Sequence, residues 1–477
     1  MSVVSVQREL FSIFGEFFAK ATGKTPKEFA SLREFSETIR KNARKIGPRT
    51  VRAFEWGIPK LAAFYEQQRT TLFQAARIQG GIKVVLGGGG PFRRTQLNAV
   101  RRLLLYADSV LIPDPILTWI ETDRQEERFR HVLLLERLFF LLRLRRLVDA
   151  DFGYPPLIVF PSWERTLALT DIYTRGRIDL LISHVLSVYL GKQFSNVIEI
   201  AEYASSHGDK FLAAVESSNL FVAPGGTVGE PIQAAISRYR SEVQQWRAGV
   251  HLEDLKRLSD AQLVYNAILE RLEPQFHVIE NANELKAQPL FAITAQAHYF
   301  NLCASASNNI LVENEIITPP TRATMKALSQ LRFEWLGNAP IAALVEMRQK
   351  NENEQFRDKL SKSIASLNSA SFEDLDRVAS EVGLAIGALL NDHKQEARRI
   401  EEEYKNKFAG IAGGAWLTAA VSAIPYLAPL FAAVQPLLLT KQYTETKLSQ
   451  KREKRELANS LLGILAGVEN DSGPEDE

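Results

Sequence analysis

Residues 82–90 read IKVVLGGGG, a short apolar run that ends in four consecutive glycines. A run of this length bounded by glycine is typical of a strand that is buried on both faces and ends in a turn. After Pro91, apolar residues recur at helical spacing to about Tyr106. The stretch therefore predicts a strand, a glycine turn and a helix, which is the unit that builds parallel sheets.

Four more apolar runs follow, at residues 109–112, 157–160, 220–223 and 276–279, with helical patterns between them. The first three of these end at proline, and the last is the weakest. Strands that alternate with helices predict crossover connections and a parallel sheet. We therefore expect a central α/β domain at residues 81–285.

The rest of the chain has mainly helical patterns, so the expected fold class is mixed and predominantly α. A helical N-terminal region is predicted at residues 1–80 and a further helical region at 286–370. Residues 371–467 predict antiparallel helices that carry an apolar hairpin. Residues 468–477 end in the acidic run ENDSGPEDE, which predicts a disordered tail.

Composition sets the broad class of the protein. A chain of 477 residues with 45% hydrophobic and 24% charged residues predicts two or three globular domains. The formal net charge of +2 gives no strong nucleic-acid signal. One cysteine, Cys303, excludes an intramolecular disulfide and fits a reducing compartment. Because Arg8 and Glu9 interrupt the N-terminal apolar pattern, no secretory signal is predicted and a cytoplasmic location is expected.

The most unusual stretch is 408–440, FAGIAGGAWLTAAVSAIPYLAPLFAAVQPLLLT, which has no charged side chain. As one straight helix it would be about 50 Å long, well beyond the roughly 30 Å of a bilayer core. Pro425 and Pro429 each remove an intrahelical hydrogen bond, so a break is predicted near Ile424. Two arms of about 16 residues follow, each roughly 24 Å long. The stretch therefore predicts an apolar helical hairpin.

Basic residues flank this stretch on both sides, with Lys405 and Lys407 before it and Lys441 and Lys447 after it. Lysine beside a membrane segment prefers the cytoplasmic side, which suits a hairpin with both ends on one side. Three interpretations are open: contact with or insertion into a membrane, burial in a soluble core, or a surface for a protein partner. The residues predicted to contact lipid are Trp416, Leu417, Val421, Ile424, Tyr426, Leu427, Leu430 and Phe431.

The glycine turn after the first predicted strand is one ligand-binding candidate. Backbone N–H groups in such a turn can face a phosphate, and the start of the following helix favours an anion. The predicted binding residues here are Gly87, Gly88, Gly89, Gly90, Arg93 and Arg94. The pattern is neither a Walker A loop nor a complete dinucleotide fingerprint, because it has no GK[ST] and Phe92 stands where the third glycine belongs. The alternative is a simple flexible turn.

Further candidates follow the other predicted strands, because ligands of open parallel sheets bind beyond the carboxyl ends of strands. The residues expected at this edge are Asp114, Ser162, Glu164, Gly225, Gly226 and Thr227. Asp114, between two prolines, is rigidly placed and suits a metal or a ribose hydroxyl. The alternative is ordinary turn chemistry, since turns use these residue types. None of the seven histidines has a zinc-binding spacing, so no metal site is predicted.

Three functional hypotheses result, and the sequence does not decide whether the protein is an enzyme. The first is a cytoplasmic bacterial effector whose C-terminal hairpin contacts or inserts into the inner membrane under the control of an α/β body. The second is an α/β enzyme or module that binds a nucleotide or phosphate and buries the hairpin as core. The third is a helical scaffold whose apolar helix at 132–148 contacts a protein partner.

Overall fold

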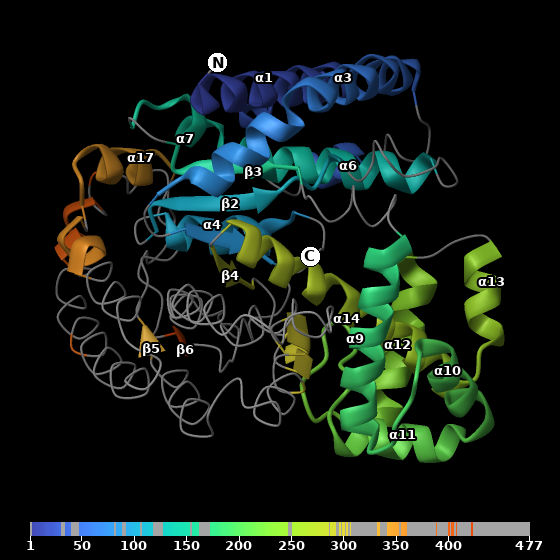
Figure 1. Ribbon diagram of the computed structural model, residues 1–477. Helices are drawn as coiled ribbons and strands as arrows, with labels where there is room; N and C mark the ends of the chain where they lie inside the picture. Colours follow the sequence, from blue (N-terminus) through green and yellow to red (C-terminus); the bar gives the residue numbers. More distant parts are fainter. Residues whose placement is uncertain are drawn as a thin grey trace.

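In a computed structural model, the chain forms a small parallel sheet surrounded by helices (Figure 1). The residues that the structure describes are 2–29, 34–39, 47–80, 83–87, 92–104, 107–117, 127–152, 155–161, 172–246, 250–285, 287–291, 295–296, 298–300, 302–303, 306, 332–333, 341–352, 354–359, 388, 399–400, 402–404, 407 and 421–422.

The sheet has four short strands in the order β3-β2-β1-β4, and every neighbouring pair is parallel. The strands are β1 (Lys83–Leu86), β2 (Ser109–Pro113), β3 (Leu157–Phe160) and β4 (Gln288–Leu290). The first three coincide with predicted strands. The prediction of a mixed, predominantly α fold with a parallel sheet is confirmed.

Both faces of the sheet are covered. Val84, Val110 and Val159 belong to the main hydrophobic core, whereas the alternate residues Val85 and Leu111 belong to a second cluster on the opposite face. Phe73 and Ala76 of α3 (Pro48–Ile78) and Leu285 of α14 (Asp260–Leu285) join that second cluster. Burial on both faces explains why these strands have continuous apolar sequences.

The predictions of strands at residues 220–223 and 276–279 were wrong. Residues 220–223 form no strand but a buried connection outside the sheet, where the Val222 backbone N–H donates to Tyr299 Oη at 2.9 Å. Residues 276–279 lie inside α14. The prediction failed here because a short apolar run is compatible with a helix as well as with a strand. The sequence also failed to reveal β4, which contains Pro289. This strand lies at the edge of the sheet, where proline is tolerated.

The N-terminal helices α1 (Val3–Thr22) and α3 pack side by side above the sheet (Figure 1). At their crossing, Gly57 of α3 faces the ring of Phe17 so closely that a Cβ added at this glycine would lie 2.6 Å from Phe17 Cγ. Thr25 and Glu28 form a capping box that opens a single 3-10 turn, η1 (Pro26–Glu28).

Helices α6 (Glu127–Leu142) and α7 (Arg145–Asp149) contact α1. The apolar side chains that were considered as a partner surface lie inside this chain: Leu134, Leu135, Leu138, Phe139, Phe140, Leu141, Leu142, Leu144, Leu147 and Val148 are all buried. Phe35 and Phe139 stack with ring centroids 4.0 Å apart. These apolar side chains are therefore part of the core of this chain, and contact of the helix with a protein partner stays a prediction.

Gln7 of α1 closes the outer edge of β3. Its Nε2 donates to Val159 O at 2.6 Å, and its Oε1 accepts a hydrogen bond from Val159 N at 3.0 Å. Gln7 is buried, so this side chain replaces water as the partner of an edge strand. The amide thereby mimics one residue of a further strand.

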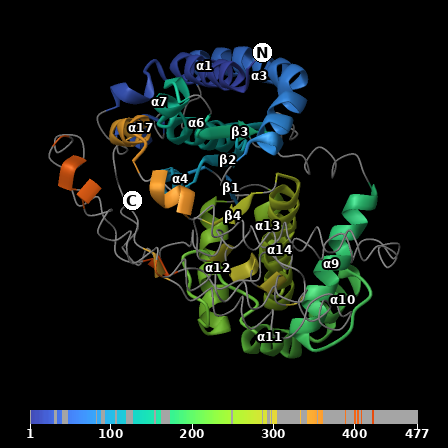
Figure 2. The same cartoon turned by 60° about the vertical axis from the view of Figure 1, so that its left-hand side comes forward.

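A helical group that contains α14 lies beyond the β4 edge of the sheet, whereas α1 lies beyond the β3 edge (Figure 2). Its other members are α9 (Ile172–Leu190), α10 (Val197–Ser206), α11 (Gly208–Ser217), α12 (Ile232–Trp246) and α13 (Val250–Arg257). α14 contacts α9, α10 and α11 and also β1 and β4, so it joins this group to the sheet. The domain boundaries predicted at residues 81, 286 and 371 remain predictions.

Helix α17 (Ile341–Gln349) holds the end of the crossover helix α4 (Arg94–Leu103). The buried Arg348 guanidinium donates to the carbonyl oxygens of Leu104, Ala107 and Asp108, with Nη1 2.9 Å from Ala107 O and Nη2 3.0 Å from Asp108 O. Leu104 is the C-cap residue of α4, where a cation is favourable, and Ala107 and Asp108 lie in the connection from α4 to β2.

A short antiparallel pair joins β5 (Arg332–Phe333) to β6 (Val421–Ser422). The helix predicted at Val421 is thus a two-residue strand. The rest of 408–440, with Trp416, Leu417, Ile424, Tyr426, Leu427, Leu430 and Phe431, lies outside the described residues. Within the described part of the chain, no helix is both long enough and apolar enough to cross a membrane.

The α1–α3 crossing generates the first prediction. A methyl group at Gly57 would meet three ring atoms of Phe17 at 2.6–2.8 Å. We expect Gly57→Ala to lower the free energy of unfolding by roughly 1–3 kcal/mol, as overpacking does. Gly80→Ala is the control, since nothing lies within 4 Å of the position that its methyl group would occupy. Urea unfolding followed by circular dichroism measures both, and equal effects would contradict the close crossing.

The capped edge of β3 generates the second prediction. Gln7→Met keeps the approximate shape of the side chain but leaves the N–H and C=O of Val159 without this partner. We expect a loss of about 2–4 kcal/mol in the free energy of unfolding. Glu9→Met, at an exposed position of the same helix, should change it by less than about 0.5 kcal/mol. Unfolding curves as cooperative and as stable as those of the unmodified protein would disprove the role of Gln7.

Candidate functional site

The strand order places β1 at a topological switch point. From β1 the chain crosses to β2 on one side and then to β3, whereas β4 returns on the other side of β1. All four strands are parallel, so their carboxyl ends lie at one edge of the sheet. In open α/β sheets, ligands bind beyond this edge at the strand where the order reverses.

The predicted glycine turn begins at this switch point. Gly87 directly follows β1, and its N–H donates to Leu290 O at the end of β4 at 2.7 Å. Gly87 therefore lies between the carboxyl ends of the two strands whose connections diverge. Gly88, Gly89 and Gly90 lie outside the described residues.

The helix α4 begins at Arg94, shortly after the glycines, in a basic sequence. Phe92 is buried and anchors the chain, whereas Arg93 beside it is exposed. Arg93 is the N-cap residue, and its backbone N–H donates to Gln96 Oε1 at 3.0 Å. The first turn of the helix has no acidic side chain. The positive end of the helix dipole and the basic sequence together favour an anion.

Asp114 lies at the same edge, directly after β2, but the structure gives it a structural task. Its carboxylate Oδ1 accepts hydrogen bonds from the backbone N–H groups of Ile116 at 2.6 Å and Leu117 at 3.3 Å. The side chain is buried and shapes the turn that leaves the strand. Turn chemistry therefore explains Asp114 at this position. Ser162 and Glu164 lie outside the described residues.

The loop Gly225–Thr227 is not part of this edge. It lies between α11 and α12 and follows a segment that is no strand of the sheet. Gly225 has a φ of 64°, and Gly226 N donates to Ala223 O at 2.9 Å, which closes a tight turn. The strand argument that grouped Gly225, Gly226 and Thr227 with Gly87 therefore fails. Ligand binding by these three residues stays a prediction from sequence.

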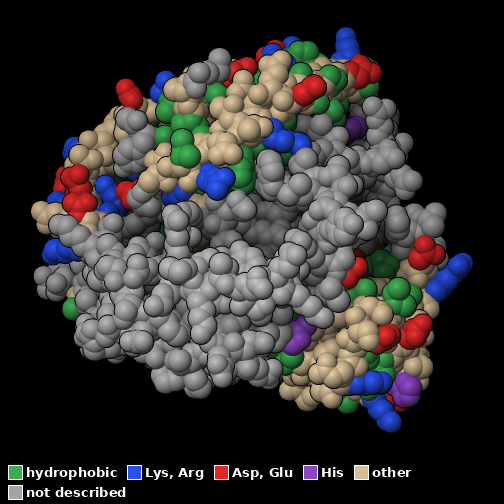
Figure 3. Space-filling view, in the orientation of Figure 1, with side chains coloured by type: hydrophobic (Ala, Val, Ile, Leu, Met, Phe, Trp, Pro, Cys, Tyr) green, Lys and Arg blue, Asp and Glu red, His purple; other side chains and the backbone are tan. Residues whose placement is uncertain are grey.

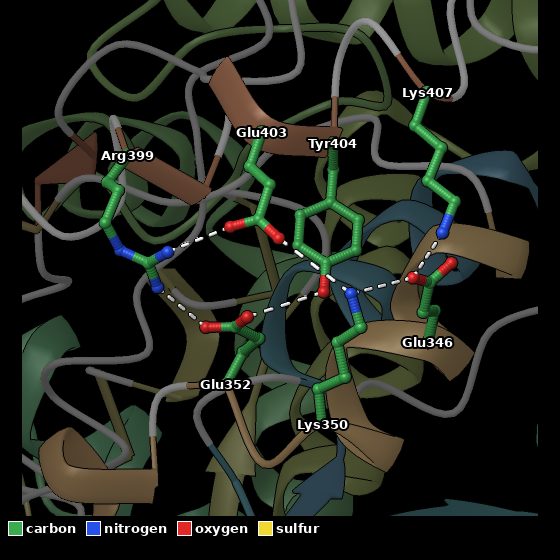
Figure 4. A network of polar contacts seen from close by, with 7 residues as sticks. All are labelled: Glu346, Lys350, Glu352, Arg399, Glu403, Tyr404 and Lys407. Carbon is green, nitrogen blue, oxygen red and sulfur yellow. Dashed lines mark hydrogen bonds and ion pairs between the residues drawn. The ribbon is translucent and has the colours of Figure 1, made fainter.

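A second polar assembly joins α17 to residues 399–407 and was not predicted (Figure 4). Its members are Glu346, Lys350, Glu352, Arg399, Glu403, Tyr404 and Lys407. Lys407 Nζ lies 2.5 Å from Glu346 Oε1, and Arg399 Nη2 lies 2.8 Å from Glu352 Oε2. The hydroxyl of Tyr404 donates to Glu352 Oε1 at 3.4 Å. Ion pairs thus connect α17 to a segment that follows it by about 50 residues in the sequence.

The end of α17 positions the acidic side chains. Asn351 has a φ of 55°, in the left-handed region that asparagine tolerates. The Glu352 N–H then donates back to Met347 O at 2.9 Å, as in a Schellman cap. This turn brings Glu352 beside Arg399, while Glu346 and Lys350, one helical turn apart, pair along the helix at 3.0 Å.

The assembly contains three carboxylates and three cations, so its charges balance. Hydrogen bonds from Lys407 and then from Lys350 lower the pKa of the Glu346 carboxyl. A lowered carboxyl pKa means that this pairing stabilises the folded protein above the usual glutamate range and is lost as the pH falls through the lowered value. The arrangement holds two segments together and offers no group poised for chemistry.

Over the described part of the face seen in Figure 3, basic and acidic side chains are interspersed. An anion that binds at the start of α4 would therefore be attracted by the groups that contact it and not by a large basic surface. Among the described residues, no group of three or more His, Cys, Asp or Glu side chains is placed to hold a metal ion. Cys303 is buried, and this burial raises the pKa of its thiol, so the thiolate nucleophile is disfavoured.

Comparison of the chain with protein-family models, with curated proteins and with solved structures found no match.

Proposed function

We propose that the protein binds a phosphate-bearing anion, with nucleotides as the leading class, at the carboxyl end of β1. The observation that carries this proposal is the strand order β3-β2-β1-β4, which makes β1 the switch strand. The glycine turn and the basic start of α4 follow this strand directly. Their combination is the arrangement that parallel α/β sheets use for phosphate groups.

Three contributions to affinity are expected. Backbone N–H groups at the start of α4 have no helical carbonyl partner and can donate to phosphate oxygens. The helix dipole adds about half a positive charge at the same place. Arg93 is exposed beside the buried Phe92, so its guanidinium can bind a phosphate in a bidentate manner.

The test is calorimetric titration of the intact protein with ATP, GTP and inorganic pyrophosphate, and then of the Arg93→Ala variant with whichever of them binds. Loss of a charge-assisted hydrogen bond should weaken binding roughly ten- to a hundredfold. Arg101→Ala is the matched control, because Arg101 lies in the last turn of the same helix, where its Nη1 is 3.4 Å from Asn98 Oδ1. This control should bind within about twofold of the unmodified protein.

Two outcomes would contradict the proposal. One is that none of the three ligands binds the intact protein. The other is that Arg93→Ala and Arg101→Ala weaken binding equally, since a general positive charge on α4 would then explain the affinity.

A second proposal is membrane association through 408–440, as a cytoplasmic effector at the inner membrane with the α/β body in control. Its support is the sequence of this stretch, which is uncharged over its whole length and has lysines on both sides. Lys407, the last residue before the stretch, is held to the body by its ion pair with Glu346. A controlled hairpin needs such an attachment to the body.

Flotation with vesicles that contain phosphatidylglycerol tests this second proposal. A variant with Ala420→Asp and Leu430→Asp should no longer float, because a carboxylate in the bilayer costs about 3 kcal/mol at each position. Ala420→Val with Leu430→Ile keeps the stretch apolar and should float like the unmodified protein. Failure of the unmodified protein to float, together with unfolding of the aspartate variant, would show that the stretch is core.

A further inference from the structure

Residues 399–407 carry two helical stripes. We call this segment the strap; its described residues are Arg399, Ile400, Glu402, Glu403, Tyr404 and Lys407, and all six are helical. Ile400 and Tyr404, four residues apart, are 0% and 1% exposed and belong to the main core. Arg399, Glu403 and Lys407 recur at the same spacing, so they form a neighbouring charged stripe with the order plus, minus, plus.

Glu346, Lys350 and Glu352, at the end of α17 and just after it, carry the complementary charges minus, plus, minus. Arg399 of the strap pairs with Glu352 at 2.8 Å, and Lys407 pairs with Glu346 at 2.5 Å. Between these two, Lys350 Nζ lies 3.9 Å from Glu403 Oε1. The strap and α17 therefore run antiparallel and form a ladder of three ion pairs with alternating polarity (Figure 4).

Alternating polarity specifies the register of docking. A shift of the strap by one helical turn would place Glu403 opposite Glu346 and Arg399 opposite Lys350. The opposite shift would place Glu403 opposite Glu352 and Lys407 opposite Lys350. Either shift creates two like-charge pairs, which are unfavourable at this distance. The apolar residues Ile400 and Tyr404 favour contact without such directional preference.

The ladder is also accessible to ions. The strap side chains Arg399, Glu403 and Lys407 are 50%, 44% and 55% exposed, whereas their partners Glu352 and Glu346 are 14% and 23% exposed. Ion pairs at such exposure are weakened by salt. Tyr404 lies between the rungs, since Lys350 Nζ is 5.3 Å from its ring centroid and Glu352 accepts from its hydroxyl.

We propose that the strap is a detachable docking segment whose register and attachment on α17 are set by this charge ladder. High ionic strength, or any change of charge at a rung, releases the strap and exposes Ile400 and Tyr404. Lys407, the last rung, directly precedes the uncharged stretch 408–440 in the sequence. Attachment of the strap therefore fixes the place on the body from which that stretch continues. This inference does not depend on the phosphate site.

Hydrogen–deuterium exchange of peptides that cover the strap, measured on the intact protein, tests the proposal. Lys407→Glu and Glu346→Lys should each speed exchange about tenfold, because each places like charges opposite one another. The double variant restores attraction across this rung but places like charges beside Lys350 and Glu403 along the two helices, so exchange should return only part of the way to that of the unmodified protein. Glu354→Lys, an exposed neighbour outside the ladder, should leave exchange unchanged.

Salt provides the second arm of the test. Raising NaCl from about 0.05 M to about 1 M should speed exchange in the unmodified protein but not in peptides of β1 and β2. The proposal is overturned if salt has no effect on the strap, or if the double variant exchanges as fast as the single variants while β1 and β2 stay protected. If a variant at this rung fails to fold, Arg399→Glu with Glu352→Arg poses the same question at the opposite end of the ladder.

Discussion

The constraint on which the rest of the structure depends is the burial of a small parallel sheet on both faces and at an edge. Four strands of three to five residues cannot be stable alone, so helices must cover them. α3 and α14 supply one face, and Gln7 of α1 supplies hydrogen bonds to the outer edge of β3. At the start of β1, buried Lys83 donates to the carbonyl oxygens of Ala76 and Arg77 near the end of α3. The N-terminal helices are thus part of the sheet's environment.

Much of the sheet is predictable because β1, β2 and β3 are buried on both faces and, after Lys83 and Ser109 at the starts of β1 and β2, have apolar sequences. β4 is hidden from sequence reasoning, since Gln288 and Pro289 break the apolar pattern and the strand depends on pairing with β1. The opposite error at residues 220–223 has a related cause. An apolar run shows that a segment is buried, but only tertiary contacts, such as that of Val222 with Tyr299, show what it pairs with.

The candidate sites also differ in how far they could be predicted from the sequence. Gly87 and Arg93 are predictable because a strand, a turn and a helix are adjacent in sequence. Their location at the switch point of the sheet could not be predicted, because it depends on the pairing of β4 with β1. Asp114 shows the limit of residue type as evidence, because its carboxylate shapes a turn. The ladder between α17 and the strap could not be predicted, since Glu346 with Lys350 and Arg399 with Glu403 are ordinary helical pairs until the two segments meet.

The central claim is that a phosphate-bearing anion binds at the switch point beside β1. The most direct measurement is the hydrogen–deuterium exchange of the whole protein with and without pyrophosphate or ATP. The account predicts slower exchange in peptides that cover residues 83–97 and no change in peptides that cover the loop at residues 219–232. Protection of the second loop alone, or no protection anywhere at saturating ligand, would contradict it.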